Sequence, residues 1–167
     1  DMGDLVLKVV SNRLVEVVRA SDTVARLGGD EFVVLLPSCA QASHAERVAE
    51  KIIASVTQVI DGKGKEIFIT PSIGITHFST DIPNDDELIK CADIAMYHAK
   101  NLGKCQYVMY SESLRESQQT QDMMSDELAN AMALNEFEIH HRFVMDVAST
   151  TNCGAEPMLR WKHPQRG

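Results

Sequence analysis

The sequence predicts an α/β (α+β) protein in which helices flank a central, mostly antiparallel sheet. Apolar residues recur at helical spacing in several segments, and short runs rich in β-branched residues lie between those segments. Glycine-containing turns separate the two kinds of segment. These observations give the order helix, hairpin, helix, strand, helix, strand over residues 1–110.

The first helix and a hairpin are predicted from residues 4–36. Residues 4–20 carry the apolar stripe of an amphipathic helix, at Leu5, Val9, Leu14 and Val17 or Val18. The runs TVARL and FVVLL predict two strands. The GGDE between them predicts a tight turn, because glycine adopts positive φ without a steric penalty.

Residues 43–60 predict a second helix that ends where Gly62 takes a left-handed conformation. Residues 67–78 predict a strand, with Pro71 at a bulge or an edge because proline donates no backbone hydrogen bond. The third helix is expected to start at Asn84 or Asp85 and to end at Gly103. Its apolar face contains Leu88, Cys91 or Ala92, Ala95 and Ala99, and QYVMY adds a short strand.

Residues 111–167 predict a linker helix and then the beginning of a second domain. Residues 111–135 are polar but keep a loose helical period, which indicates a linker helix. Within residues 136–167, the runs FEIHHRFVMDV and CGAEPMLRW predict two strands, the first hairpin of a second domain.

The composition limits the partners. The net charge is -8 and the pI is about 5.2, so we do not expect a nucleic-acid polymer or an anionic membrane surface as partner. No apolar run approaches the roughly 20 residues that span a bilayer, and no leader pattern is seen, which favours a cytoplasmic location. The four cysteines lack CxxC spacing, and we expect reduced thiols.

The turn between the first two strands carries the most specific chemistry. Gly28 and Gly29 precede two consecutive acids, Asp30 and Glu31. Spacing alone allows two interpretations. One is a solvent-exposed turn in which the two acids are only polar surface residues. The other is a bare turn where a ligand reaches backbone and the acids hold Mg²⁺ in front of phosphates, since Mg²⁺ prefers carboxylates together with substrate phosphate oxygens.

Four segments in order resemble one family. RLGGDEF at residues 26–32 resembles the signature of the GGDEF family, diguanylate cyclases that condense two GTP molecules into cyclic di-GMP. MGDLVLKVV near the start, PSIGIT at residues 71–76 and ADIAMYHAKNLGK at residues 92–104 resemble other segments of that family. The resemblance implies a nucleotide-cyclase or palm-like fold. It also implies a homodimer, because each domain holds one GTP and two must face each other.

The resemblance assigns roles to individual residues. It implies that Asp30 binds Mg²⁺ or Mn²⁺, and that Glu31 binds a second ion or helps to deprotonate the attacking 3′-hydroxyl. Gly28 and Gly29 would lie against the nucleotide. Asp4 would accept hydrogen bonds from the guanine edge; without the resemblance it is an exposed residue favoured by the helix dipole.

Two basic residues and the RASD segment complete the implied site. Lys100 and Lys104 match the family's phosphate-binding residues; taken alone they are charge partners of a helix C-terminus. Arg19 and Asp22 match an inhibitory site that binds the product cyclic di-GMP as a feedback ligand. As an isolated pattern, RxxD more often forms a surface ion pair.

The resemblance also implies parts that these 167 residues do not include. The family's domain begins with a strand that bears another metal-binding aspartate, followed by a lysine and an asparagine for GTP. Residues 1–110 therefore resemble a partial GGDEF domain, and we expect this excerpt to be inactive. GAEPMLRW resembles the opening of an EAL-family phosphodiesterase domain, in which Glu156 would bind metal, although Pro157 and Met158 depart from that pattern.

Three functions follow as alternatives. The first is a diguanylate cyclase domain within a GGDEF-EAL signalling protein, with GTP as substrate. The second is a catalytically silent module that binds GTP or cyclic di-GMP as a regulatory receptor. The third is a dimerising spacer. The intact acids at residues 30 and 31 favour the first.

Overall fold

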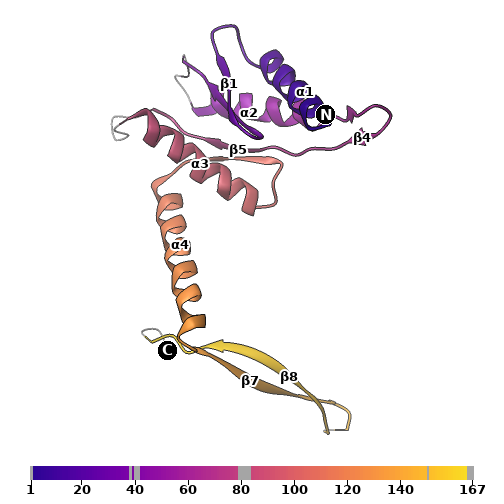
Figure 1. Ribbon diagram of the computed structural model, residues 1–167, viewed down its shortest axis with the longest axis vertical. Helices are drawn as coiled ribbons and strands as arrows, with labels where there is room; N and C mark the ends of the chain where they lie inside the picture. The colour runs from indigo at the N-terminus through magenta and orange to yellow at the C-terminus, as the bar shows by residue number, and fades with distance from the viewer. Residues whose placement is uncertain (1, 38, 40–41, 79–83, 150, 165–167) are drawn as a thin grey trace. The chain divides into compact units, whose positions relative to one another are not determined.

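The computed structural model describes residues 2–37, 39, 42–78, 84–149 and 151–164. The chain forms two compact units, Asp1–Arg115 (unit 1) and Glu116–Gly167 (unit 2) (Figure 1). Mixed helices and small sheets confirm the predicted α/β (α+β) class.

Unit 1 alternates helices and short strands. Its elements are α1 (Met2–Val17), β1 (Thr23–Gly28), β2 (Glu31–Leu35), α2 (Ala42–Val56), β3 (Ile60–Asp61), β4 (Glu66–Ile67), β5 (Ser72–Ile75), α3 (Asp85–Asn101), β6 (Gln106–Met109) and the first turn of α4 (Glu112–Ala133). The pairs β1–β2 and β3–β4 are antiparallel. The pair β5–β6 is parallel, because α3 returns the chain to the same end of the sheet before β6 begins.

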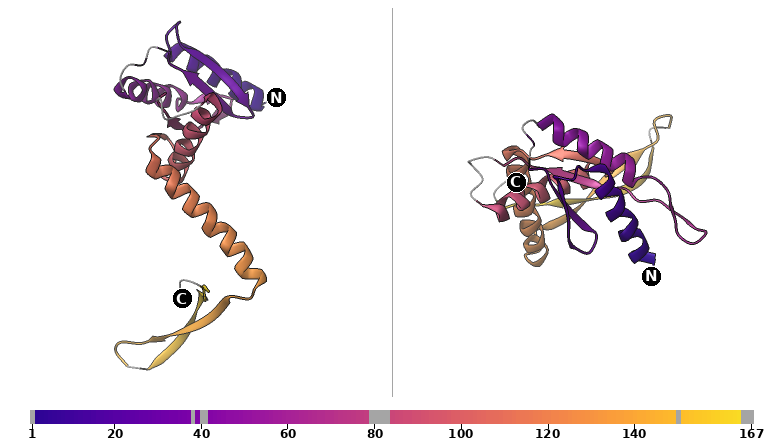
Figure 2. Two further views of the ribbon diagram at one scale, coloured as in Figure 1. Left: turned by 90° about the vertical axis from the view of Figure 1, so that its left-hand side faces the viewer. Right: turned by 90° about the horizontal axis from the view of Figure 1, so that it is seen from above.

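The strands of the described residues form separate two-stranded sheets rather than one continuous sheet. Packing against helices, more than sheet pairing, therefore holds unit 1 together. Leu14 of α1 packs with Ile52 and Val56 of α2, and Figure 2 shows the two helices next to each other. Ala45 and Ala49, on another stretch of α2, pack against Ile75 of β5.

Helix α3 lies on the β5–β6 pair through its small residues. Cys91, Ala95 and Ala99 are completely buried, as the helical spacing predicts. Gly74 of β5 faces the backbone of this helix so closely that no side chain fits between them. The predicted helix boundaries are also confirmed: the Asn84 side chain accepts a hydrogen bond from the Glu87 backbone N–H at 2.9 Å, and Gly103 follows the last turn with φ 112°.

The end of α2 was predicted wrongly. The helix stops at Val56 instead of residue 60, and Ile60 pairs with Ile67 in the β3–β4 hairpin. The cause lies far away in sequence, because the Arg13 guanidinium of α1 donates hydrogen bonds to the backbone carbonyls of Val56, Gln58 and Val59 at 3.1, 2.7 and 3.1 Å. Gly62 consequently does not cap a helix.

Positive φ occurs at the next two residues instead, Lys63 and Gly64, within the β3–β4 turn. The strand predicted over residues 67–78 is likewise broken, since β4 ends at Ile67 and β5 begins at Ser72, directly after Pro71. Both differences arise where tertiary contacts decide a boundary that periodicity alone places a few residues away.

Unit 2 contains the rest of α4 and the antiparallel hairpin of β7 (Phe137–Met145) and β8 (Asn152–Trp161). The predicted linker helix and hairpin are thus present as secondary structure; the domain boundaries proposed at residues 110 and 135 stay predictions. An apolar groove of about 440 Å³ lies within the unit, lined by Leu128, Ala129, Met132, Phe137 and Leu159. In the described parts of the chain, no helix is long and apolar enough to cross a membrane.

Candidate functional site: an acidic turn beside two glycines

The β1–β2 hairpin reverses direction over two residues. Gly28 pairs with Glu31, so Gly29 and Asp30 are the central residues of the turn. Gly29 has φ 52°, and Asp30 is not among the residues with positive φ. Positive φ at the first central position alone is the pattern of a type II′ turn, which glycine favours there. The sequence GGDE therefore forms the predicted tight turn, because Gly29 adopts the positive φ that this turn requires.

Both acids of the turn are presented to solvent. Asp30 and Glu31 are exposed, and neither carboxylate accepts a hydrogen bond or forms an ion pair within the part of the chain that the structure describes. Acidic side chains that stabilise a fold are usually engaged as helix caps or in ion pairs. Nothing in the hairpin uses these two, which leaves their oxygens available to an external cation.

Gly28, directly before the turn, has open space where a side chain would lie. A Cβ atom built on Gly28 meets no other heavy atom within 4 Å, and its φ is not in the positive range. The backbone of this residue therefore does not require glycine, for either conformation or packing. Gly29 differs, because its positive φ disfavours a side chain.

Arg26 of β1 contacts the turn, although sequence reasoning gave it no role. Its Nε and Nη2 atoms donate hydrogen bonds to the Gly29 carbonyl oxygen at 2.9 and 2.7 Å. The signal available in the sequence was only its position within RLGGDEF, which does not tell whether a side chain turns back toward the backbone.

The other predicted substrate residues lie on three elements of unit 1. Asp4 is in the first turn of α1, and Lys100 is in the last turn of α3. Lys104 lies just beyond that helix with φ 62°, and its backbone N–H donates to the Ala99 carbonyl at 3.1 Å. All three side chains are exposed.

The RASD segment forms a turn that uses its own aspartate. The Asp22 carboxylate accepts hydrogen bonds from the Arg19 backbone N–H at 2.9 Å and from the Ser21 hydroxyl at 3.3 Å. In the described residues, the Arg19 guanidinium forms no ion pair with Asp22 and is exposed. The surface ion pair weighed for this pattern is therefore not formed, and the arginine side chain is available.

Glu156, the predicted metal ligand of unit 2, is engaged with a neighbouring strand. The Arg142 Nη2 donates to its Oε2 at 2.6 Å across the β7–β8 pair, and both side chains are more than half exposed. No group of three or more His, Cys, Asp or Glu residues suited to a metal occurs among the described residues.

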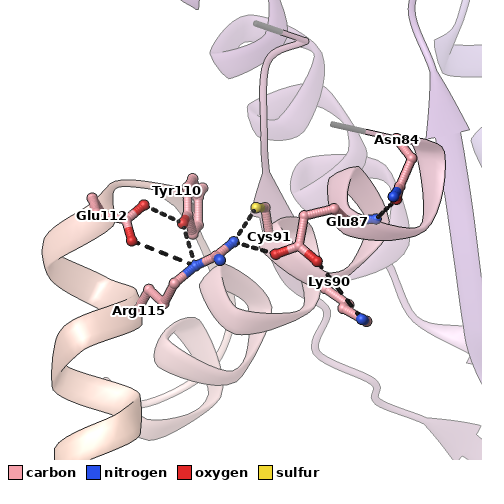
Figure 3. Close-up of polar contacts among 7 residues, drawn as sticks. All are labelled: Asn84, Glu87, Lys90, Cys91, Tyr110, Glu112 and Arg115. Carbon is pink, nitrogen blue, oxygen red and sulfur yellow. Dashed lines mark hydrogen bonds and ion pairs between the residues drawn. The ribbon is translucent and has the colours of Figure 1, made fainter. Parts of the chain in front are cut away.

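A second polar cluster joins α3, the residue that follows β6 and the start of α4 (Figure 3). Arg115 donates to Glu87 Oε1 at 2.6 Å, to the Tyr110 hydroxyl at 2.8 Å and to the Cys91 sulfur at 3.1 Å. The Tyr110 hydroxyl in turn donates to Glu112 at 2.9 Å. Burial, with the hydrogen bond to Glu112 acting in the same direction, raises the pKa of Tyr110 to about 12. This cluster is structural: each member is satisfied by another.

The fold and the turn together define the class: a small α/β domain that presents two adjacent carboxylates on a glycine turn. The family model "Diguanylate cyclase, GGDEF domain" matches residues 1–106. The chain belongs to the GGDEF family.

Named relatives are similar to this chain over almost its whole length. The chain is 36% identical to the bifunctional diguanylate cyclase/cyclic di-GMP phosphodiesterase MucR of Pseudomonas aeruginosa, over 99% of this chain and 24% of MucR. It is 32% identical to the cyclic di-GMP phosphodiesterase NbdA of the same organism, over 100% of this chain and 21% of NbdA. The chain thus spans about a quarter or less of the length of these relatives.

A solved structure supports the fold. The GGDEF domain of TpbB, also called YfiN, from Pseudomonas aeruginosa is 35% identical and superposes with a TM-score of 0.66, covering 71% of this chain and 69% of that chain.

Proposed function

We propose that unit 1 is the diguanylate cyclase domain of a GGDEF-EAL signalling protein, which condenses two GTP molecules into cyclic di-GMP and releases two pyrophosphates. The observation that carries this proposal is the β1–β2 turn, where Asp30 and Glu31 are exposed and unengaged beside the open space at Gly28. In each half-reaction a 3′-hydroxyl oxygen bonds to the α-phosphorus of the other GTP, and the bond to pyrophosphate breaks.

The residues of the turn fit a magnesium or manganese site. Mg²⁺ is usually held by one or two carboxylates together with substrate phosphates, and Asp30 and Glu31 offer two neighbouring exposed carboxylates. When bound, the ion would stabilise negative charge on the attacking and leaving oxygens. The chain's own part is to hold the Asp30 and Glu31 carboxylates at a fixed turn beside backbone that a triphosphate can approach.

The remaining substrate residues have supporting roles in this proposal. Lys100 and Lys104 bind phosphate oxygens as flexible positive charges, and Asp4 accepts hydrogen bonds from the guanine N1–H and amino group. Catalysis uses a homodimer in which each protomer brings one GTP. Cyclic di-GMP returns as an inhibitor to Arg19, whose exposed guanidinium can bind phosphate or guanine, and to Asp22. We place the protein in the cytoplasm, where GTP is available.

The 167-residue chain by itself is expected to be inactive. It does not include the additional metal-binding aspartate, or the lysine and asparagine for GTP, that the resemblance implies. For unit 2 we propose that residues 136–167 belong to an EAL-type domain. Its acid Glu156 would have to exchange its Arg142 partner for a metal ion.

The test compares two glycines that have the same steric surroundings in the fold. Both Gly28 and Gly154 have open space around a built Cβ and no positive φ. Gly28→Ala should leave folding unchanged but weaken GTP binding by about tenfold or more, because the new methyl group displaces the nucleotide. Gly154→Ala is the matched control. The assay incubates the full-length natural protein with GTP and Mg²⁺ and separates cyclic di-GMP by chromatography.

Isosteric changes of the acids complete this test. Asp30→Asn and Glu31→Gln keep the shape of the turn but remove the negative charge, so product should fall below detection in each. Unchanged product formation in either variant would contradict the proposed role of that acid.

One observation favours the receptor alternative. NbdA, similar over the whole chain, carries the name of a phosphodiesterase alone. If the full-length natural protein forms no cyclic di-GMP, while calorimetry detects cyclic di-GMP binding that Arg19→Ala abolishes, the domain is a receptor. Binding of GTP that Asp30→Asn abolishes, without product, would likewise assign a regulatory role to the turn.

A further inference from the structure

We propose that Arg26 is a positioning residue that selects the backbone conformation of the acidic turn, and thereby the direction in which the backbone N–H of Asp30 faces. The consequence for turnover rests on the proposed cyclase function. The structural part rests on the hairpin alone.

Arg26 is placed to act on one peptide group. Its two donors, at 2.9 and 2.7 Å, share a single acceptor, the Gly29 carbonyl oxygen. That carbonyl belongs to the peptide plane between Gly29 and Asp30, which is the central peptide of the turn. A planar fork that binds one oxygen through two N–H groups fixes the orientation of that oxygen more strictly than a single donor does.

The orientation of this peptide is the difference between the two common hairpin turns. Type I′ and type II′ turns both have positive φ at the first central residue, but only type I′ has positive φ at the second. Rotation of the Gly29–Asp30 peptide plane by roughly half a turn converts one into the other. The structure shows the type II′ pattern, with positive φ at Gly29 and not at Asp30.

Sterics alone do not enforce this choice. Glycine accepts either conformation at position 29, and aspartate is one of the residues that best tolerate positive φ. GGDE therefore allows both turns, and the contact from Arg26 distinguishes between them. Since the peptide is planar and trans, the Asp30 N–H points away from the side on which Arg26 holds the carbonyl.

A register irregularity brings Arg26 into reach. Arg26 pairs with Phe32 and Gly28 pairs with Glu31, so the ladder shifts between residues 26 and 28 and leaves Leu27 unpaired as a bulge. Bulges next to functional sites re-aim side chains. Here the bulge lies between the arginine and the turn whose carbonyl it binds.

The experiment compares Arg26→Ala, Arg26→Lys and the control Arg47→Ala in the ¹⁵N-labelled 167-residue chain. Arg47 is an exposed arginine of α2 whose side chain makes no hydrogen bond in the described residues. In a type II′ turn the Asp30 amide proton lies close to a Gly29 Hα; in type I′ it lies close to the Gly29 amide proton. The two nuclear Overhauser effects therefore report the turn.

Wild type and Arg47→Ala should show the Hα contact. Arg26→Ala should lose it in favour of the amide–amide contact, and Arg26→Lys, which keeps the charge without the fork, should show both. An unchanged pattern in Arg26→Ala overturns the proposal.

The activity assay in the full-length natural protein gives the second readout. Arg26→Ala should lower kcat about 10- to 100-fold with little change in KM for GTP, since a reoriented peptide beside the two acids shifts the reacting groups by a small distance, which affects the reaction more than binding. A loss of turnover without a change of the turn would also overturn the proposal, because Arg26 would then act by another route. If the wild-type protein forms no product, the proposed function fails, and the nuclear Overhauser effects alone decide the role of Arg26.

Discussion

Gly74 offers the sharpest test of how unit 1 is held together. It lies in β5 against α3, and a Cβ built on it would be 1.9 Å from the Ala92 carbonyl oxygen and 2.4 Å from the Met96 backbone nitrogen. Both obstacles are backbone atoms of a helix. No rotamer change can relieve them, so Gly74→Ala requires the helix and the strand to separate.

The size of the effect follows from these distances. Ordinary contact of a Cβ begins at about 3.4 Å, so α3 would have to move by roughly 1.5 Å. A gap of 0.5–1 Å already removes about a quarter to a half of the dispersion attraction between packed surfaces. Overpacking usually costs about 1–3 kcal/mol. Because Cys91, Ala95 and Ala99 would also lose their close packing, we expect a loss of about 3 kcal/mol or more.

The chain carries internal reporters for this measurement. Its three tyrosines, Tyr97, Tyr107 and Tyr110, are in unit 1, whereas its one tryptophan, Trp161, is in unit 2. Urea denaturation followed by tyrosine near-ultraviolet dichroism should show a midpoint lowered by about 1 M or more, given slopes of about 1–3 kcal/mol per M. Tryptophan fluorescence should change little.

Gly154→Ala, which has open space around its Cβ, is the control and should leave both transitions in place. A midpoint for Gly74→Ala equal to that of the wild type would refute the reasoning, because α3 would then not rest on the β5 backbone.

Three further outcomes are expected. Arg115→Ala removes the ion pair to Glu87 and the hydrogen bond to Tyr110, and should lower the free energy of unfolding of unit 1 by about 2 kcal/mol in urea titrations, with Arg115→Lys recovering only part. Arg13→Ala leaves the carbonyls at the end of α2 without their donor, so hydrogen exchange in that turn should accelerate relative to Arg47→Ala. Because burial raises the pKa of Tyr110 from 10.0 to about 12, the unfolded state ionises first; stability present below pH 10 should fall between pH 10 and 12, and Tyr110→Phe should remove that part of the slope.

Local patterns predicted those features that local physics decides. The Asn84 cap, the small buried face of α3 and the tight turn at residues 28–31 each depend on neighbours along the chain, and each is present. The end of α2 was wrong because Arg13, more than 40 residues away, binds the carbonyls there. No periodicity contains that information.

The sequence likewise predicts some features of the candidate site and not others. Glycines and adjacent acids are visible in the sequence, and so is their family resemblance. The contact from Arg26 to the Gly29 carbonyl is not, because it depends on a bulge that turns the side chain toward the backbone. The same holds for Asp22, whose carboxylate accepts from the Arg19 backbone rather than from its side chain.

Gly28 and Gly74 show how structure separates two reasons for glycine that sequence cannot. At Gly74 a methyl group collides with a helix, so the fold itself requires glycine. At Gly28 a methyl group collides with nothing in the described chain, and the backbone is not left-handed. A glycine of this second kind lowers the stability of a strand and offers no packing in return. Its presence beside two unengaged acids is explained if a ligand occupies the space that a side chain would fill. Gly28→Ala tests this explanation, because the added methyl group should weaken ligand binding without affecting folding.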